Sequence, residues 1–380
     1  MGDHMDALVT DDLRLLENGL EIPLSDGVRA YFNYHWLRDN CPSSFDRATR
    51  ERVFDIFHLQ APPRPSQAYV ADGALHIAWA GENHASTYAL DWLAPYGRGE
   101  RRADPADLPR KAWYSDHYAR MARFRQPDLK ADKALVAAWI EALLVDGVAL
   151  VTDMPDSDEG LTETVRLIGQ VRPTFFGDYF DVRTHIKPTN LAYTAKALEL
   201  HTDTPAEEMA PGVQFLHCRA NSVAGGDSLF LDGVAAANDF RDAYPEDFRL
   251  LSETEIPFYC EHDDYDMRSR QRVIELDKHG AVSGLTISQH MADVFDLPQA
   301  DLDAYYPAFC RFGRWLQGEK YVMRFRLNAG ECIVFDNHRI VHGRAAYVAE
   351  SGARYLRGTY SDREEMRSTY RSLVSKGRFG

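Results

Sequence analysis

The chain has 380 residues, of which 45% are hydrophobic and 12% aromatic, so it is long enough for more than one domain and for a sizeable core. Its formal net charge of −15 argues against nucleic acid or an anionic membrane surface as a partner. No apolar run approaches the ~20 residues of a membrane span and no signal peptide is evident, while five dispersed cysteines predict reduced thiols in a cytoplasmic protein.

Residues 1–97 are predicted to form a small β-rich accessory domain. Four strand-like stretches form two pairs. Within each pair, the two stretches are separated by a short turn that contains Asp-Gly, a dipeptide typical of hairpins. These stretches are 19–24, 28–34, 68–70 and 75–79. Beyond them, sequence rich in Arg, Asp and Pro and poor in apolar residues predicts a linker over residues 98–120.

The second part of the chain begins with alternating helical and strand-like sequence. Helical periodicity at 133–144 leads into a strand-like run at 147–152, and a second helix is predicted over 161–171. Asp156 and Asp158 precede the second helix, and we expect one of them to cap its N-terminus.

Short strands separated by Gly and Asn turns dominate the chain from residue 175 onward. The clearest strands are 213–218, 228–231, 321–327, 332–335 and 355–360, and a helical insert covers 234–244 and 246–252. Many short antiparallel strands predict a double-stranded β-helix, or jelly roll, over residues 121–380. The predicted fold class is therefore mainly β with flanking helices, a jelly-roll domain preceded by a small β-rich domain.

Three residues in order along the chain predict a metal centre. His201 and Asp203 are two residues apart, so in an extended strand their side chains point the same way, roughly 6–7 Å apart. The third ligand must come from a distant strand, where His342 is preferred to His338 because of its spacing to Gly343. Two histidines and one carboxylate form the facial triad that holds Fe(II) and leaves positions open for a cosubstrate and O₂.

Arg354 follows the last of these ligands by twelve residues and offers a guanidinium fork that can bind a carboxylate through two hydrogen bonds.

Several other residues are predicted to be structural. His217 alternates with Phe215 on a predicted core strand, so we expect a hydrogen-bonded core histidine, and Gly225-Gly226 is predicted to be a turn. The remaining small core residues are expected to be Cys218, Cys260, Cys310 and Cys332.

Ordered motifs over nearly the whole chain resemble the γ-butyrobetaine hydroxylases. These belong to the taurine-dioxygenase-like group of Fe(II)/2-oxoglutarate oxygenases, which includes trimethylammonium-phosphonate hydroxylases. The similar segments begin at Trp36, His84, Asn190, His201, Pro211, Gly225 and Phe335. The resemblance implies a homodimeric enzyme that uses O₂, is stimulated by ascorbate, and couples decarboxylation of 2-oxoglutarate to succinate with hydroxylation of a small molecule.

The resemblance also implies roles for individual residues. Fe(II) would be bound by His201, Asp203 and His342. The distal carboxylate of 2-oxoglutarate would be bound by Arg354, with the hydroxyl of Ser228 beside it. A quaternary ammonium group has no N–H, so it must be recognised by aromatic faces, each contributing ~0.5–2 kcal/mol. The matching aromatic positions are Phe176, Phe180, Tyr193 and Tyr360.

Two departures from the family pattern affect these expectations. The family's accessory domain commonly holds zinc through three cysteines and a histidine, but here only Cys41 and His84 stand at such positions. Ser43 and Asp46 replace thiolates, and structural zinc sites use thiolate or imidazole, so we expect no structural zinc. At the anionic end of the substrate, the family's second asparagine is missing. The residues assigned to that end are Asn190, Thr204, Ser288 and Gln289.

The sequence therefore predicts a hydroxylase of a small trimethylammonium compound with an anionic tail. The two candidate substrates are γ-butyrobetaine and 2-(trimethylammonio)ethylphosphonate. One alternative is a dioxygenase of a sulfonate or another small acid without an onium site. A second alternative is a metal-binding sensor jelly roll without turnover.

Overall fold

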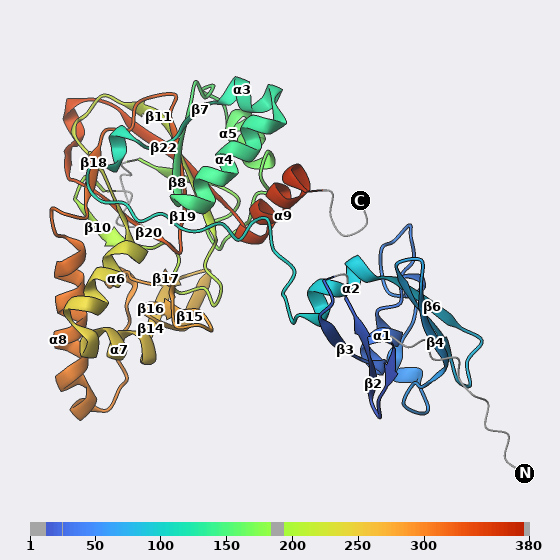
Figure 1. Ribbon diagram of the computed structural model, residues 1–380. Helices are drawn as coiled ribbons and strands as arrows, with labels where there is room; N and C mark the ends of the chain where they lie inside the picture. Colours follow the sequence, from blue (N-terminus) through green and yellow to red (C-terminus); the bar gives the residue numbers. More distant parts are fainter. Residues whose placement is uncertain (1–12, 25, 184–193, 376–380) are drawn as a thin grey trace, which may run out of the picture. The chain divides into compact units, whose positions relative to one another are not determined.

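In the computed structural model the chain divides between Asp104 and Pro105 into two compact units (Figure 1). The structure describes residues 13–24, 26–183 and 194–375. Among these residues, no helix combines the length and the apolar character that crossing a bilayer requires.

The smaller unit contains two three-stranded antiparallel sheets, β1-β2-β3 and β4-β5-β6. Alternate strand residues such as Leu20, Ile22 and Phe32 are buried, as expected for strands with one face on a core. The elements are β1 (Arg14–Leu15), β2 (Gly19–Pro23), β3 (Arg29–Asn33), α1 (Tyr34–Asp39), β4 (Pro65–Ala71), β5 (Ala74–Trp79), β6 (Ala85–Ala89) and α2 (Leu90–Gly97).

The larger unit is built around two sheets. One has six strands in the order β7-β8-β19-β11-β22-β9, and the other has four in the order β10-β20-β13-β18. Their pairs are antiparallel except for β7–β8. The strands of the larger sheet are β7 (Arg123–Arg125), β8 (Val148–Thr152), β9 (Phe180–Val182), β11 (Val213–Asn221), β19 (Cys332–Asp336) and β22 (Arg354–Ser361). Those of the smaller sheet are β10 (Leu198–His201), β13 (Ser228–Asp232), β18 (Met323–Phe325) and β20 (Ile340–Arg344).

The two sheets face each other. A single buried cluster combines Ile333 and Leu356 of the six-stranded sheet with Phe230 and Phe325 of the four-stranded sheet. Helices cover the outer face of the six-stranded sheet, where Trp139 and other apolar residues form a second cluster (Figure 1). These helices are α3 (Gln126–Ala131), α4 (Lys133–Val145), α5 (Asp158–Arg166) and α9 (Arg363–Val374). The predicted jelly roll with flanking helices is confirmed.

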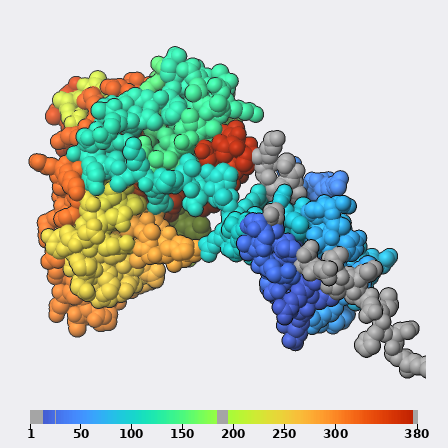
Figure 2. All heavy atoms as spheres, in the orientation of Figure 1, coloured from blue at the N-terminus to red at the C-terminus, as the bar shows by residue number. Residues whose placement is uncertain are grey.

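A third cluster lies in a lobe of helices and hairpins that follows β13. Its elements are α6 (Gly233–Ala243), α7 (Pro245–Glu253), β14 (Glu255–His262), β15 (Tyr265–Arg272), β16 (Ile274–Leu276), β17 (Val282–Leu285) and α8 (Gln299–Leu316). Figure 2 shows this lobe in yellow to orange at the surface of the larger unit.

The structure differs from several sequence expectations. The helix predicted over 161–171 is α5, which begins earlier and ends at Arg166. Its cap is Ser157, whose hydroxyl accepts a hydrogen bond from the Gly160 N–H at 3.0 Å, because a short hydroxyl side chain reaches that group well. Cys310 lies on the exposed side of α8 and is not a core residue.

The segment predicted to be a linker divides between the two units. From residue 105 onward it packs on the larger unit, where Trp113 is buried and its Nε1–H donates to the Asp146 carbonyl at 2.7 Å.

Candidate metal centre and substrate cavity

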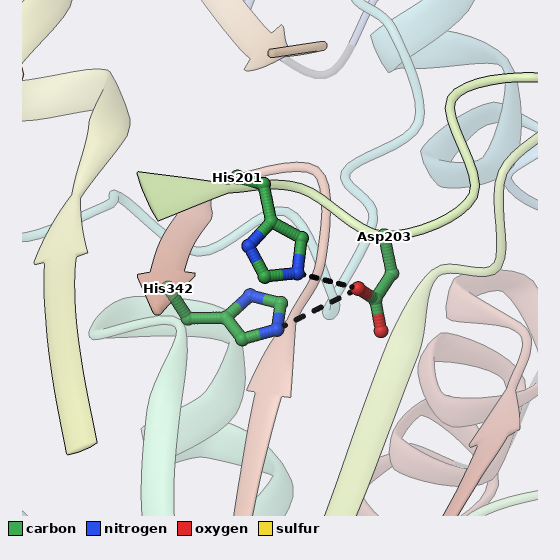
Figure 3. Close-up of side chains that lie close together, drawn as sticks. All are labelled: His201, Asp203 and His342. Carbon is green, nitrogen blue, oxygen red and sulfur yellow. Dashed lines mark ion pairs between the residues drawn. The ribbon is translucent and has the colours of Figure 1, made fainter. Parts of the chain in front are cut away.

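His201, Asp203 and His342 lie together between the sheets (Figure 3). His201 ends β10 and stands opposite His342 of β20 in the antiparallel register. The Nε2 atoms of His201 and His342 lie 3.1 and 3.6 Å from Asp203 Oδ1. One ligand atom from each of the three residues falls within 4.8 Å of the others, and among the described residues no other such cluster of His, Cys, Asp or Glu occurs.

Hydrogen bonds orient these side chains. The Nδ1–H of His201 donates to the Glu199 carbonyl at 2.8 Å, which leaves the Nε2 lone pair directed at the centre. The buried carboxamide of Asn337 holds the Asp203 backbone on both sides. It accepts from the Asp203 N–H at 2.8 Å and donates to the Asp203 carbonyl at 3.1 Å. The Tyr360 hydroxyl donates to Asp203 Oδ2 at 2.6 Å.

The electrostatics of the cluster suit a divalent cation. Burial would raise the pKa of Asp203, but the two histidines and the Tyr360 hydroxyl outweigh it and hold the pKa well below its usual range. Burial, followed by the neighbouring His201, lowers the pKa of His342 to about 3. At neutral pH the cluster therefore offers a carboxylate oxygen and a neutral imidazole, the forms that bind metal.

The cluster opens into a cavity whose wall is apolar at one part and cationic at another. The cavity is lined by Phe176, Phe180, Val182, Leu198, His201, Asp203, Thr204, Gln214, Leu216, Ser228, Phe230, His290, Met291, His342, Gly343, Arg344, Arg354, Leu356 and Tyr360. Asp203 supplies the carboxylate of this lining, so a cation or a metal would meet negative charge at one point.

Arg354 forms a cationic end of the cavity on β22. It is buried, its guanidinium lies 5.4 Å from the Tyr347 ring centroid, and burial, followed by the nearby Arg344, lowers its pKa to about 10. Among the described residues, its Nε and Nη1 have no hydrogen-bond partner. Gly226, with φ of 76°, leaves room beside the arginine stem, and Ser228 contributes a buried hydroxyl to the same cavity. This end fits the carboxylate of an organic acid.

An aromatic part of the wall lies towards the other end of β22. The rings of Phe180 and Tyr360 stack with centroids 5.2 Å apart and planes inclined by 27°, and Phe176 lines the same cavity. Phe180 of β9 pairs in register with Gly358 of β22. A side chain at Gly358 would collide with the Phe180 ring, so the glycine allows the ring to lie across the strand.

The residues predicted to meet the anion are only partly in the cavity. Thr204 lines it, buried, with a φ of 52° that is rare for a β-branched residue. Neither Ser288 nor Gln289 lines the cavity. Ser288 is buried with its hydroxyl 3.4 Å from His290 Nδ1, and Gln289 is exposed. The short helical turn at 289–291 directs His290 inward in their place.

Other sequence predictions have different outcomes. Asn190 and Tyr193 lie outside the described residues. Gln214 was not predicted, yet it is buried, lines the cavity and presents an Oε1 without a hydrogen-bond partner among the described residues. Its signal is a polar residue between the apolar Val213 and Phe215 at the start of a strand. His290 follows Ser288 and Gln289 in the segment that the sequence places at the anion, and of these three residues it is the one that lines the cavity.

Two histidines lie away from the centre. His338 Nε2 bonds the Ala210 carbonyl at 3.0 Å and does not line the cavity. His217 is fully buried, but the expectation of a hydrogen-bonded core histidine is wrong within the described residues, where neither ring nitrogen has a partner. Its strand turns that side chain towards the helix-covered face, where apolar groups dominate.

In the smaller unit, the positions compared with zinc ligands have other contacts. Cys41 Sγ lies 3.1 Å from Ser43 Oγ, and His84 Nε2 lies 3.3 Å from Ser86 Oγ. Asp46 accepts hydrogen bonds from the backbone of its own turn.

Comparison with known proteins agrees with the geometry. Residues 114–360 match the family described as "Taurine catabolism dioxygenase TauD, TfdA family", and residues 13–94 match "Gamma-butyrobetaine hydroxylase-like, N-terminal". The chain is 31% identical over 360 residues to gamma-butyrobetaine dioxygenase from Pseudomonas sp. (strain AK-1), covering 92% of each chain. It is 30% identical over 353 residues to the Homo sapiens gamma-butyrobetaine dioxygenase, covering 89% of this chain and 90% of the relative. It is 26% identical over 371 residues to mitochondrial trimethyllysine dioxygenase from Mus musculus, covering 94% and 86%.

These matches confirm the resemblance read from the motifs. The family match spans most of the larger unit, and two relatives at 30% identity or above cover most of the chain. The chain therefore belongs to the TauD/TfdA dioxygenase family and is an iron(II)- and 2-oxoglutarate-dependent dioxygenase.

Proposed function

We propose that this dioxygenase hydroxylates a small trimethylammonium compound that carries an anionic tail. The observation that carries the proposal is the stacked pair Phe180–Tyr360, which lines the cavity next to Asp203. The names of the relatives support it, because γ-butyrobetaine and trimethyllysine are both trimethylammonium compounds.

In this proposal His201, Asp203 and His342 hold Fe(II). Arg354 binds the distal carboxylate of 2-oxoglutarate, and the hydroxyl of Ser228 donates to it. The two guanidinium nitrogens of Arg354 that have no partner among the described residues support this assignment, since a buried cation requires an anion or other acceptors. With the metal bound, oxidative decarboxylation of 2-oxoglutarate by O₂ supplies the oxidant that hydroxylates a C–H bond.

Aromatic faces recognise the onium group because it cannot donate a conventional hydrogen bond. Phe176, Phe180 and Tyr360 supply the faces, each contributing about 0.5–2 kcal/mol. Tyr360 and Arg354 stand six residues apart on one strand, so the two ends of the cavity are separated by up to about 20 Å. The oxygen of Gln214, opposite Tyr360 in the register, adds negative potential at the onium end.

The anionic tail meets Thr204 and His290, which both line the cavity. A hydroxyl and an imidazole can donate to either a carboxylate or a phosphonate. The two candidate substrates are therefore γ-butyrobetaine and 2-(trimethylammonio)ethylphosphonate, and the substrate panel below distinguishes the carboxylate from the phosphonate. The homodimer, the stimulation by ascorbate, the absence of structural zinc and the cytoplasmic location stay predictions.

The test is a panel of trimethylammonium carboxylates and phosphonates, assayed for coupled succinate release with the product mass measured. The central comparison is γ-butyrobetaine against the isostere that carries a tert-butyl group in place of trimethylammonium. Equal binding of the two would contradict the onium site and favour a small-acid dioxygenase. Succinate release at the substrate-free rate with every compound would favour the sensor alternative.

A variant separates the aromatic site from general damage. Phe180→Leu keeps an apolar side chain but removes the ring, so onium affinity should fall by about 5–30-fold. Phe57→Leu, at a 90% exposed ring of the smaller unit, is the matched control and should leave onium affinity unchanged.

A further inference from the structure

The two oxygens of the Asp203 carboxylate have different surroundings. Oδ1 faces the Nε2 atoms of both His201 and His342, at 3.1 and 3.6 Å. Oδ2 points away from them and accepts the Tyr360 hydroxyl hydrogen bond at 2.6 Å. A hydroxyl–carboxylate bond of this length is charge-assisted and strong. The carboxylate is thus held with one oxygen turned to the centre and the other engaged.

Tyr360 is itself firmly placed. It is 3% exposed and pairs with Gln214 of β11 near the end of β22. Its carbonyl accepts from the Arg172 N–H at 2.9 Å, and its ring packs on Phe180. With the strand and ring fixed in this way, the phenol hydroxyl is preorganised for Asp203.

We propose that Tyr360 is a positioning residue for the metal-binding carboxylate, in addition to its place in the onium site. Its hydroxyl keeps Asp203 in the orientation that presents a single oxygen to the metal. The inference rests on the proposed function in one respect, namely that the cluster of His201, Asp203 and His342 holds the metal. Without the hydroxyl, the carboxylate can rotate and share both oxygens, so the site loses its preset geometry. Hydrogen-bond partners of metal ligands typically account for about 10–100-fold in metal affinity or activity.

The same side chain therefore has two separable parts. The ring face acts on the substrate cation, whereas the hydroxyl acts on the metal ligand. Removing the hydroxyl alone should weaken metal binding and leave the aromatic face in place. Removing the neighbouring ring of Phe180 should produce the opposite pattern.

The experiment compares Tyr360→Phe, Phe180→Leu and the parent enzyme. Mn(II) affinity is measured calorimetrically without substrate or 2-oxoglutarate, and γ-butyrobetaine and 2-(trimethylammonio)ethylphosphonate affinities are measured separately at saturating metal. Tyr360→Phe should weaken Mn(II) binding by about 10-fold or more, with onium affinity changed by less than about threefold because the ring stays. Phe180→Leu keeps an apolar side chain against the Tyr360 ring, so Mn(II) affinity should stay within about twofold while onium binding weakens.

Tyr355→Phe is the matched control, because Tyr355 lies on the same strand and its hydroxyl bonds Asp181 Oδ1 at 3.1 Å, away from the cavity lining. It should retain parental Mn(II) affinity. Unchanged Mn(II) affinity in Tyr360→Phe, or an equal loss in Tyr355→Phe, would overturn the positioning role. If the parent binds no trimethylammonium compound, the proposed function fails, and the Mn(II) affinities still decide the role of Tyr360.

Discussion

Replacing Gly358 by alanine should damage the onium site without altering any side chain that lines it. A Cβ atom at Gly358 would lie 2.5 and 2.7 Å from Cε2 and Cε1 of the Phe180 ring, and closer still to Cζ. Carbon atoms pack at about 3.5–4.0 Å, so the ring must move by roughly 1 Å or more. That displacement breaks the stacking of Phe180 on Tyr360, which now places the centroids 5.2 Å apart.

The expected cost follows from the lost aromatic face. One desolvated cation–π face contributes about 1–2 kcal/mol, so trimethylammonium affinity should fall by about 5–30-fold in Gly358→Ala. The affinity for 2-oxoglutarate should change by less than about twofold, because Arg354 stands four residues away on the strand and keeps its surroundings. Both constants are measured by calorimetry with Mn(II) in place of iron.

The control is Gly313→Ala in α8, where an added Cβ meets no atom within 4 Å. It should bind both ligands normally. Parental onium affinity in Gly358→Ala would refute the reasoning, since the ring would then have moved without consequence. An equal loss of 2-oxoglutarate affinity would also refute it, because it would mean that the whole strand had shifted.

Three further predictions concern single residues elsewhere in the larger unit. Arg354→Ala should weaken 2-oxoglutarate binding, measured by calorimetry, by at least about 30-fold, as expected for the loss of a buried charge pair. Arg357→Ala, which removes an ion pair with Asp181, should leave 2-oxoglutarate affinity unchanged. His342→Ala should abolish metal binding and turnover while His338→Ala retains both, and the reverse pattern would disprove the ligand assignment. Burial, as the largest cause, lowers the pKa of His217 from 6.5 to about 4, so the folded state keeps it neutral while the unfolded chain takes up a proton below about 6.5. The free energy of unfolding should therefore fall as pH decreases from about 6.5 to 4. In His217→Leu, measured by urea unfolding, this free energy should fall less steeply with pH, by up to about 1.4 kcal/mol per pH unit. Equal slopes in the parent and the variant would contradict a neutral, buried His217.

Local patterns were sufficient to predict the strands that carry the site. An apolar run that ends before Asp336, preceded by an Asn-Ala-Gly turn, predicts β19. Gly330 of this turn adopts the positive φ that such a turn needs. The period of two along a strand predicts that Arg354 and Tyr360 share a face, and both line the cavity. Such features depend on neighbours in sequence, so they can be read without the fold.

Features that depend on distant contacts were not predicted. Helix α8 contains Pro307 and several aromatic residues, which are poor helix formers, and it is stabilised by packing of Tyr305, Phe312 and Leu316 in the lobe core. The hydrogen bond from Tyr360 to Asp203 joins residues 157 positions apart and leaves no local pattern. The inward turn of His290 likewise depends on the surrounding lobe.

The pairing of β10 with β20 has a consequence for how the protein folds. His201 and His342 meet only when these strands pair, and Asn337 joins Asp203 across 134 residues of chain. Closing a loop of that size is entropically costly, and contacts so far apart in sequence form late. A partly synthesised or partly folded chain therefore cannot offer all three side chains to a metal ion. Metal binding stabilises only the closed domain. Added metal should therefore slow unfolding of the folded protein, but it should not accelerate the earliest steps of refolding.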